Sequence, residues 1–460
     1  MRLNDTKNGM IEAPFLKKLI RFAIPVILTG LLQCFYNAAD TAIVGSLRGE
    51  TALAAVGSTG ALNGAIVNLF MGLSVGAGVS VARAFGADNN KKAQKVIHSS
   101  IVLAMILGVV VGVVGFFFAG PLLKLMDTPD TVIELSALYM QINFFAMPAS
   151  LLYNYCAAIL RSANDAKRPL YFLLISGAVN VLLNLLFVGG FGMSVDGVAL
   201  ATVISQYLSA TLIVTYMVRS KEKFRVSIKN LCLDVDAVKD ILMIGIPSGI
   251  QTTLFSLSNV LIQANINSFG ELTMAGNSAA VNLESFIHTA MVSMYHAALA
   301  FVGQNMGAKR YDNVKRVAFN CIFLVVVIGT GLSLFIGLFR IPLLGLYTDS
   351  SEVVKWATYR MLFILPVYPL CGMMDVTSAT LRAMGRSITA MVNALLGACA
   401  FRIVWVSVIF NFVSRDIGWI YAAFGISYVI GIALNSTFIV LKYRSIKKEE
   451  QSLSLNEAVQ

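Results

Sequence analysis

The two halves of this 460-residue sequence repeat the same landmarks at a constant offset of 221 residues. Gly49-Glu50 recurs as Gly270-Glu271, and Leu160-Arg161 recurs as Leu381-Arg382. Prolines recur as well: Pro121 with Pro342, Pro148 with Pro369 and, at an offset of 222, Pro25 with Pro247. Because chance would not keep one register over about 180 residues, the chain is expected to contain two copies of one structural unit.

The composition predicts that this duplicated unit lies in a membrane. Hydrophobic residues make up 57% of the chain and charged residues only 13%. A bilayer core is about 30 Å thick and needs roughly 20 apolar residues per helix. Backbone polar groups in this core must form hydrogen bonds within the protein, which only helices and closed β-barrels allow, and the apolar runs of this sequence are too long for barrel strands. We therefore expect an all-α membrane protein with twelve transmembrane helices in two pseudo-symmetric lobes of six. The expected spans are 15–44, 52–82, 96–119, 132–160, 169–192, 196–218, 238–267, 274–302, 316–340, 354–382, 387–412 and 417–442.

The net charge of +11 is interpreted as a topology signal and not as a sign of a nucleic-acid partner. Most Lys and Arg residues fall on one side of the twelve expected spans, and cytoplasmic loops are the ones enriched in these residues. Both termini are therefore expected in the cytoplasm. The first span has no small-residue cleavage site after it, so it is expected to be an anchor and not a removed signal peptide.

Four segments are expected along the chain. The first lobe covers 1–218, a cytoplasmic linker 219–237, the second lobe 238–445 and a cytoplasmic tail 446–460. The linker is polar and basic, which suggests a surface-lying amphipathic helix. The tail is charged and is expected to be loose.

Asp40 is the best candidate for a functional site. A charged group at the bilayer centre costs about 2.5–3.5 kcal/mol, so an acid at this depth is a functional candidate by default. An acid that is protonated in one state and ionised in another meets the requirement for ion coupling. The alternative is an acid near the outer end of the helix that reaches water. Helical spacing places Asp40 on a polar face of the first span, together with Gln33, Asn37 and Thr41.

The second half carries further polar residues at membrane depth. Asp375 is expected near mid-membrane, where an ion pair with Arg360 or Arg402 is the structural alternative. Glu284, His288 and His296 share one stripe of the span 274–302, where Glu284 and His296 can carry protons or contact a cationic substrate. The alternative for this stripe is a polar seam between helices. Their spacing differs from that of zinc proteases. Two more residues, Gln251 and Asn259, lie on a polar stripe of the span 238–267.

Energy input is expected from an ion gradient. The sequence has no glycine-rich phosphate loop followed by Lys-Ser/Thr, so direct use of ATP is not expected. One charge moving through 100 mV provides about 2.3 kcal/mol, enough for roughly a forty-fold substrate gradient. Pro25 and Pro247 occupy corresponding positions in the first span of each lobe and are interpreted as hinges or fixed kinks.

Through several short motifs, the chain resembles the multidrug and toxic compound extrusion (MATE) family over essentially its whole length. Twelve spans in two halves with cytoplasmic termini also fit, and the sequence is more similar to the bacterial DinF-type branch than to the NorM branch. The motifs are Asn37-Ala-Ala-Asp40-Thr41, Leu160-Arg161-Ser162, Gly197-Val-Ala-Leu-Ala-Thr202, Gly303-Gln-Asn-Met-Gly-Ala308 and Leu381-Arg382-Ala383.

This resemblance implies a secondary antiporter that exports organic, often cationic and amphipathic, compounds in exchange for protons or sodium. It implies an ion site made by Asp40, Tyr139, Asn180, Asn184 and Thr202. At position 184 the family commonly has aspartate, and this departure favours either protons or a weaker sodium site. A second site would use Asp375. The glutamate expected in the seventh span is absent, and Glu284 is the suggested substitute.

The implied protein is a monomer in the bacterial cell membrane. We expect no catalytic residues and no cofactor, and the only metal ion expected is sodium, at Asp40 or Asp375. Two other functions remain open. A lipid-linked saccharide flippase of the same superfamily would need a more cationic cavity, and Arg360 and Arg402 facing that cavity together would favour it. An intramembrane enzyme would use Glu284 and His288 and would act without a gradient.

Overall fold

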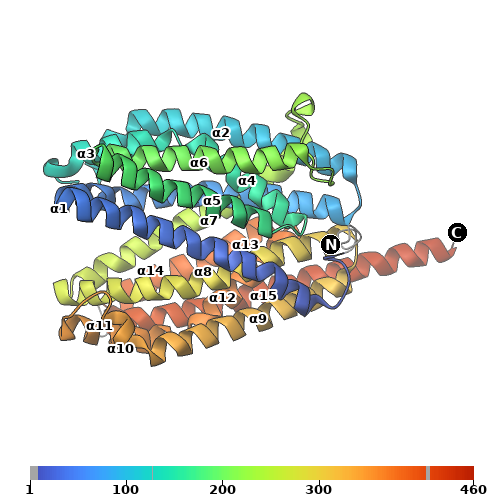
Figure 1. Cartoon of the computed structure of the whole chain (residues 1–460). Coiled ribbons are helices and arrows are strands. Elements are labelled where there is room, and N and C mark those ends of the chain that lie inside the picture. The colour runs from blue at the N-terminus through green and yellow to red at the C-terminus, as the bar shows by residue number, and fades with distance from the viewer. Residues whose placement is uncertain (1–8, 127, 411–414, 460) are drawn as a thin grey trace. The chain divides into compact units, whose positions relative to one another are not determined.

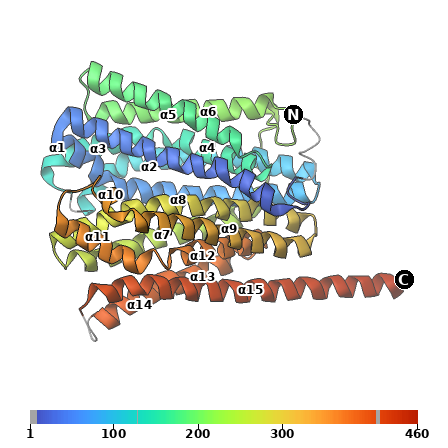
Figure 2. The ribbon, with the colours of Figure 1, turned by 60° about the horizontal axis from the view of Figure 1, so that its bottom comes forward.

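The computed structural model describes residues 9–126, 128–410 and 415–459. Every element among them is a helix (Figures 1 and 2). The helices are α1 (Phe15–Gly86), α2 (Asn90–Leu125), α3 (Asp130–Phe144), α4 (Met147–Ser162), α5 (Lys167–Asn184), α6 (Val195–Arg219), α7 (Val235–Asn267), α8 (Glu271–Gly307), α9 (Tyr311–Leu338), α10 (Arg340–Leu344), α11 (Ser351–Ile364), α12 (Tyr368–Ala383), α13 (Ser387–Ala394), α14 (Phe401–Trp405) and α15 (Ile417–Val459).

The described helices confirm the expected fold class. Ten helical segments are long and apolar enough to span a bilayer, and α3 with α4 and α11 with α12 each form a bent pair that can serve as one further span. Helix α1 contains two of the ten spans, because the chain turns at Gly49, where φ is 79°. The last residues of the expected span 387–412 lie outside the described part of the chain.

The duplication extends to backbone conformation. Left-handed φ angles are rare in L-residues other than glycine, so their recurrence is informative. Among the described residues, six of the seven positive φ angles form three pairs at the 221-residue offset: Gly49 (79°) with Gly270 (99°), Asp88 (50°) with Lys309 (55°), and Asn164 (66°) with Gly385 (87°). The turns between helices are therefore repeated as closely as the helices themselves.

Both repeats also break the same helix. Helices α3 and α4 meet at 49°, and α11 and α12 meet at 50°. Pro148 and Pro369 lie in the first turn of the second helix of each pair. Proline lacks the amide hydrogen of an intrahelical bond, and it is tolerated in a first helical turn. This explains why the fourth and tenth spans are each two shorter helices.

Pi-helical segments recur too. Leu185–Gly190 follows α5, and Val406–Phe410 begins at the same offset in the second repeat. The second repeat has an additional π-helical segment, Leu395–Ala400. Such segments are rare and frequently occur at functional sites.

Contacts divide the chain into two compact units, residues 24–249 and residues 1–23 with 250–460. The first contains most of the first repeat, and the second contains most of the second repeat. Two helices are divided between the units. Residues 15–23 of α1 belong to the unit that contains most of the second repeat, and residues 235–249 of α7 belong to the unit that contains most of the first repeat. The lobe boundaries expected at 218 and 238 stay a prediction.

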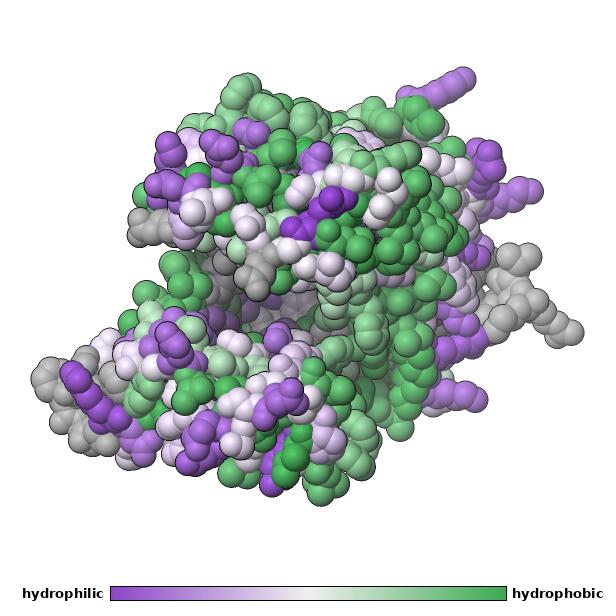
Figure 3. All heavy atoms as spheres, turned by 60° about the vertical axis from the view of Figure 1, so that its left-hand side comes forward, coloured by the Kyte–Doolittle hydropathy of each residue, from purple (hydrophilic) through white to green (hydrophobic). Residues whose placement is uncertain are grey.

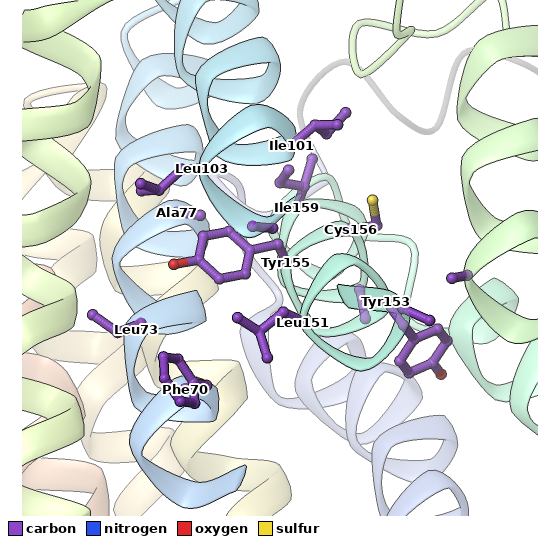
Figure 4. Close-up of a cluster of buried hydrophobic side chains, with 14 of the residues drawn as sticks. Phe70, Leu73, Ala77, Ile101, Leu103, Leu151, Tyr153, Tyr155, Cys156 and Ile159 are labelled. Carbon is purple, nitrogen blue, oxygen red and sulfur yellow. The ribbon is translucent and has the colours of Figure 1, made fainter. Parts of the chain in front are cut away.

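The core of the first unit shows how the glycine-rich spans pack. Side chains from α1, α2 and α4 meet in one apolar cluster that includes Leu73, Ile101 and Tyr155 (Figure 4). At the α2–α4 contact, a Cβ on Gly108 would lie 2.4 Å from the Pro148 Cα. Glycine is therefore required for this close approach, as expected for small residues between membrane helices.

Two expected features outside the spans were wrong. The linker contains only a short 3₁₀ turn, Ile228–Asn230, and no amphipathic helix. It is fixed to α2 instead, since Asp234 accepts a hydrogen bond from Lys95 at 2.7 Å. The tail after 445 is not loose, because α15 continues as one helix to Val459 (Figure 2).

Large apolar side chains are exposed along the spans, as in a protein whose solvent is lipid. Phe117 and Leu338 are about 70% and 69% exposed, and hydrophobic atoms cover broad areas of the surface (Figure 3). Exposed apolar areas of this extent indicate a membrane-facing surface. The chain is thus a multi-pass membrane protein.

Candidate functional site

The Asp40 carboxylate is held by an asparagine at the end of α5. The Asn184 Nδ2 donates a hydrogen bond to Asp40 Oδ1 at 2.5 Å and lies 3.3 Å from Asn180 Oδ1. Asn180 and Asn184 are one helical turn apart, so both amides lie on the same face of α5. Asn184 is fully buried, and the π-helical segment Leu185–Gly190 begins directly after it.

Two further elements complete the surroundings of Asp40. Thr202, on α6, donates its hydroxyl to Val198 O at 3.0 Å and interacts with the Asp40 carboxylate. Tyr139, on α3, is buried and interacts electrostatically with Asp40. The structure therefore brings together all five residues of the expected ion site, from α1, α3, α5 and α6.

One atom of this cluster has no hydrogen-bond partner in the described part of the chain. The Asn184 Oδ1 is buried and accepts no hydrogen bond from the described residues. A buried amide oxygen without a partner costs free energy unless something else satisfies it. Next to a carboxylate, such an oxygen is suited to accept a hydrogen bond from a bound group or to contact a cation.

Tyr36 and Gly177 position the site, and sequence reasoning missed both. A Cβ on Gly177 would lie 1.8 Å from the Tyr36 ring, so only glycine lets this ring lie against α5. The Tyr36 hydroxyl donates to Leu174 O at 3.3 Å. Tyr36 precedes Asp40 by one helical turn, and this contact therefore sets how closely α1 approaches the asparagines.

In the second unit, Glu284 forms a buried ion pair with Arg360. Arg360 Nε and Nη2 donate to the two carboxylate oxygens of Glu284 at 2.9 Å and 2.7 Å. Arg360 Nη1 donates to Asn277 Oδ1 at 2.8 Å. The two charged side chains are only 6% and 4% exposed. Glu284 is thus neutralised in this structure, and its suggested role beside Asp375 stays a prediction.

Asp375 pairs with a histidine and not with either arginine considered above. The distance between His288 Nε2 and Asp375 Oδ2 is 3.6 Å. Cys371 lies one turn before Asp375 on α12, and its sulfur belongs to the same cluster. Sequence reasoning took the histidine and the aspartate separately and missed the cysteine, although the i, i+4 spacing of Cys371 and Asp375 was a usable signal.

Of the remaining expected polar residues of this unit, Gln251 and His296 both contact the Arg382–Tyr295 pair, and Asn259 does not join them. Gln251 accepts a hydrogen bond from Arg382 Nη2, and Arg382 Nη1 donates to the Tyr295 hydroxyl at 2.6 Å. The His296 ring packs edge-on against Tyr295 at 5.4 Å. Asn259 is exposed on α7. The polar stripe expected along this helix therefore divides between buried and exposed positions.

The sequence matches a known protein family in both of its repeats. The model of the MatE family matches residues 25–186 and 247–408, which are the two repeats. The chain belongs to the MatE family. Its members are transporters, as the motifs around Asp40 and the two Leu-Arg pairs led us to expect.

Individual relatives are similar in sequence to this chain over most of its length. It is 28% identical to the probable multidrug resistance protein YoeA of Bacillus subtilis (strain 168), covering 90% of this chain and 91% of that protein. It is 23% identical to an FAD transporter of Shewanella oneidensis, covering 84% and 86%. A solved MOP superfamily transporter from Pyrococcus furiosus shares the fold, with a TM-score of 0.91, 20% identity and coverage of 97% and 100%.

Proposed function

We propose that this MatE protein is a secondary antiporter that exports small organic compounds, cationic or amphipathic, in exchange for protons or sodium. The observation that carries the proposal is the Asp40 carboxylate, held by the buried Asn184 within a membrane-spanning unit. The multidrug relative supports efflux as the direction of transport. No cofactor is required, because the ion gradient supplies the energy.

The mechanism depends on how Asp40 changes between two states. A bound ion shifts a conformational equilibrium only by its differential affinity for the two conformations. Asp40 must therefore meet different partners when the transporter faces the cytoplasm and when it faces outside. We propose that ion binding neutralises Asp40, that α1 rearranges around Pro25, and that substrate is then released outside. Pro247 has the corresponding role in α7.

Protons are the favoured coupling ion. In the arrangement described, Asn184 presents its amide nitrogen to Asp40, and a donor in this position does not ligate a cation. One carboxylate with amide partners also gives a sodium ion little compensating charge. A proton needs only one free carboxylate oxygen. This supports protons over sodium at the Asp40 site.

The deciding experiment is transport in proteoliposomes with pH and sodium gradients imposed separately. The panel contains cationic dyes and, because one relative is an FAD transporter, a flavin. We expect efflux of at least one cationic compound that depends on the pH gradient. Protein-free liposomes give the background. Transport that responds to neither gradient would contradict antiport.

The asparagine at 184 gives a matched test of ion choice. Asn184→Asp adds a second carboxylate next to Asp40, and two carboxylates favour a cation more strongly than one. We expect the variant to gain stimulation by sodium that the natural protein lacks. The measurement is initial dye efflux as sodium is varied at fixed pH. A variant with an unchanged sodium response would count against the role of this position.

The flippase alternative gains no support from the arginines. Arg360 is neutralised by Glu284, and Arg402 is 1% exposed and stacks on Phe424 at 4.3 Å. The first guanidinium is paired with a carboxylate and the second is buried, so neither is presented at an exposed surface where a lipid pyrophosphate could bind. We keep the antiporter as the proposal.

We further propose the bacterial cell membrane as the location, with both termini in the cytoplasm. Cys232 provides a natural reporter, because it is the exposed cysteine of the linker. A membrane-impermeant maleimide is expected to label inverted vesicles and to leave intact cells unlabelled. Cys232→Ser should remove the label. Labelling of intact cells that is lost in this variant would reverse the proposed topology.

A further inference from the structure

A cluster of three different metal-binding side chains lies between α8 and α12 in the second unit. His288 comes from α8, and Cys371 and Asp375 come from one face of α12. One ligand atom from each lies within 4.8 Å of the other two. Within the described ranges this is the one group of three His, Cys, Asp or Glu side chains arranged in this way.

The packing of the two helices produces the cluster. Gly372 has no side chain, and a Cβ there would lie 2.8 Å from the Met291 sulfur and 2.5 Å from Val325 Cγ2. The backbone of α12 therefore lies close to α8 beside Cys371. His288 is about one helical turn before Met291, so the same close approach brings its ring to the two ligands of α12.

The distances suit a small divalent ion. Zinc binds nitrogen and oxygen at about 2.0–2.2 Å and sulfur at about 2.3 Å in a tetrahedral arrangement, so neighbouring ligands lie roughly 3.3–3.8 Å apart. The separation of His288 Nε2 and Asp375 Oδ2 is 3.6 Å, longer than a hydrogen bond and within this range. A shift of roughly 1 Å in the longest separation would close the set around an ion.

Ligand chemistry also separates this cluster from a sodium site. Sodium and magnesium prefer oxygen ligands, whereas thiolate and imidazole favour zinc and similar borderline-soft ions. A thiolate, a carboxylate and a neutral imidazole together carry two negative charges, which a divalent cation balances. Charge balance matters here, because an uncompensated charge at membrane depth is costly.

Access and support are present as well. The His288 and Asp375 side chains are 46% and 24% exposed, so an ion can reach two of the ligands, while Cys371 is buried. Tyr428 is buried and interacts with Cys371, which gives the sulfur a second neighbour that can orient it. Three protein ligands leave a fourth position open, as in sites that exchange their ligands.

The first repeat shows that the cluster is specific to the second. The positions equivalent to His288, Cys371 and Asp375 are Val67, Ser150 and Asn154. None of these is a strong metal ligand, so the duplicated architecture alone does not create the set. We propose that His288, Cys371 and Asp375 form a three-ligand site for a borderline-soft divalent cation such as Zn²⁺, with one coordination position open. The inference does not depend on the antiport proposal.

Cobalt is a suitable probe, because a cysteine-ligated Co²⁺ absorbs in the near ultraviolet. Titrating the purified full-length protein with Co²⁺ in detergent should give a thiolate-to-cobalt band, which Zn²⁺ abolishes and excess Na⁺ does not. Cys371→Ser should remove the band, and His288→Gln should weaken Co²⁺ binding by at least about a hundred-fold. Cys321→Ser and Cys232→Ser are the controls and should keep the band.

The outcomes decide the proposal directly. Absence of the band in the natural protein overturns it, and so does a band of unchanged strength in Cys371→Ser. If Cys371→Ser elutes abnormally on gel filtration, Asp375→Asn serves as the second variant, with the same loss expected. Asp375→Asn that binds Co²⁺ as the natural protein does would also overturn the site.

Discussion

Replacing Asp40 with asparagine is expected to abolish gradient-driven efflux and to leave the protein folded in the membrane. The substitution keeps the shape of the side chain and removes its titration and charge. With an imposed gradient of two pH units, one proton per cycle provides about 2.7 kcal/mol, which supports roughly a hundred-fold substrate ratio. In Asp40→Asn we expect a ratio of about one.

The matched control for this variant is Asp130→Asn. Asp130 is an exposed acid in the first turn of α3, in the same unit as Asp40. It should retain the substrate ratio of the natural protein. Dye accumulation in inverted vesicles and gel-filtration profiles are measured for both variants. Normal efflux by Asp40→Asn would remove the basis of the coupling mechanism.

The twelve-span fold could be predicted because the length of the apolar runs and the 221-residue repeat can both be seen in the sequence. Even the turns follow it, since Gly49 and Gly270 adopt the same left-handed conformation. The bends at the fourth and tenth spans were missed although Pro148 and Pro369 mark them. In a hydropathy profile a bent span and a straight one look the same, because the apolar run continues through the bend.

The five residues of the expected ion site were predicted as a set because the family resemblance supplied its members, and the structure brings these side chains together. The polar contacts of the second unit were not predicted. Whether Asp375 meets His288, Arg360 or Arg402 depends on the rotation of neighbouring helices about their axes, which spacing within one helix does not determine. Repeat symmetry does not help either, because Arg360 occupies the position of Tyr139, and Asp40 and Asp375 lie on helices that do not correspond, α1 and α12.

The Glu284–Arg360 pair carries the second large expected effect, on stability. Breaking a buried ion pair by removing one partner costs about 3–5 kcal/mol, because the other charge stays buried without compensation. Glu284→Gln removes the negative charge and leaves Arg360 only neutral acceptors among those described above, the glutamine Oε1 and Asn277 Oδ1. The Arg360 guanidinium also lies 5.4 Å from the Tyr421 ring, a cation–π contact that retains part of the stabilisation. We therefore expect the lower half of this range, about 3–4 kcal/mol.

The control uses the same chemical change at an exposed pair of the same unit. Glu352 and Lys355 lie 3.8 Å apart with side chains 56% and 74% exposed, and Glu352→Gln should change the free energy of unfolding by less than about 1 kcal/mol. The double variant Glu284→Gln with Arg360→Met removes both buried charges and should recover most of the lost stability. Unfolding in mixed detergent micelles measures all three. If Glu284→Gln is no less stable than Glu352→Gln, the pair does not hold α8 against α11, and Glu284 becomes available again as a second ion-coupling acid.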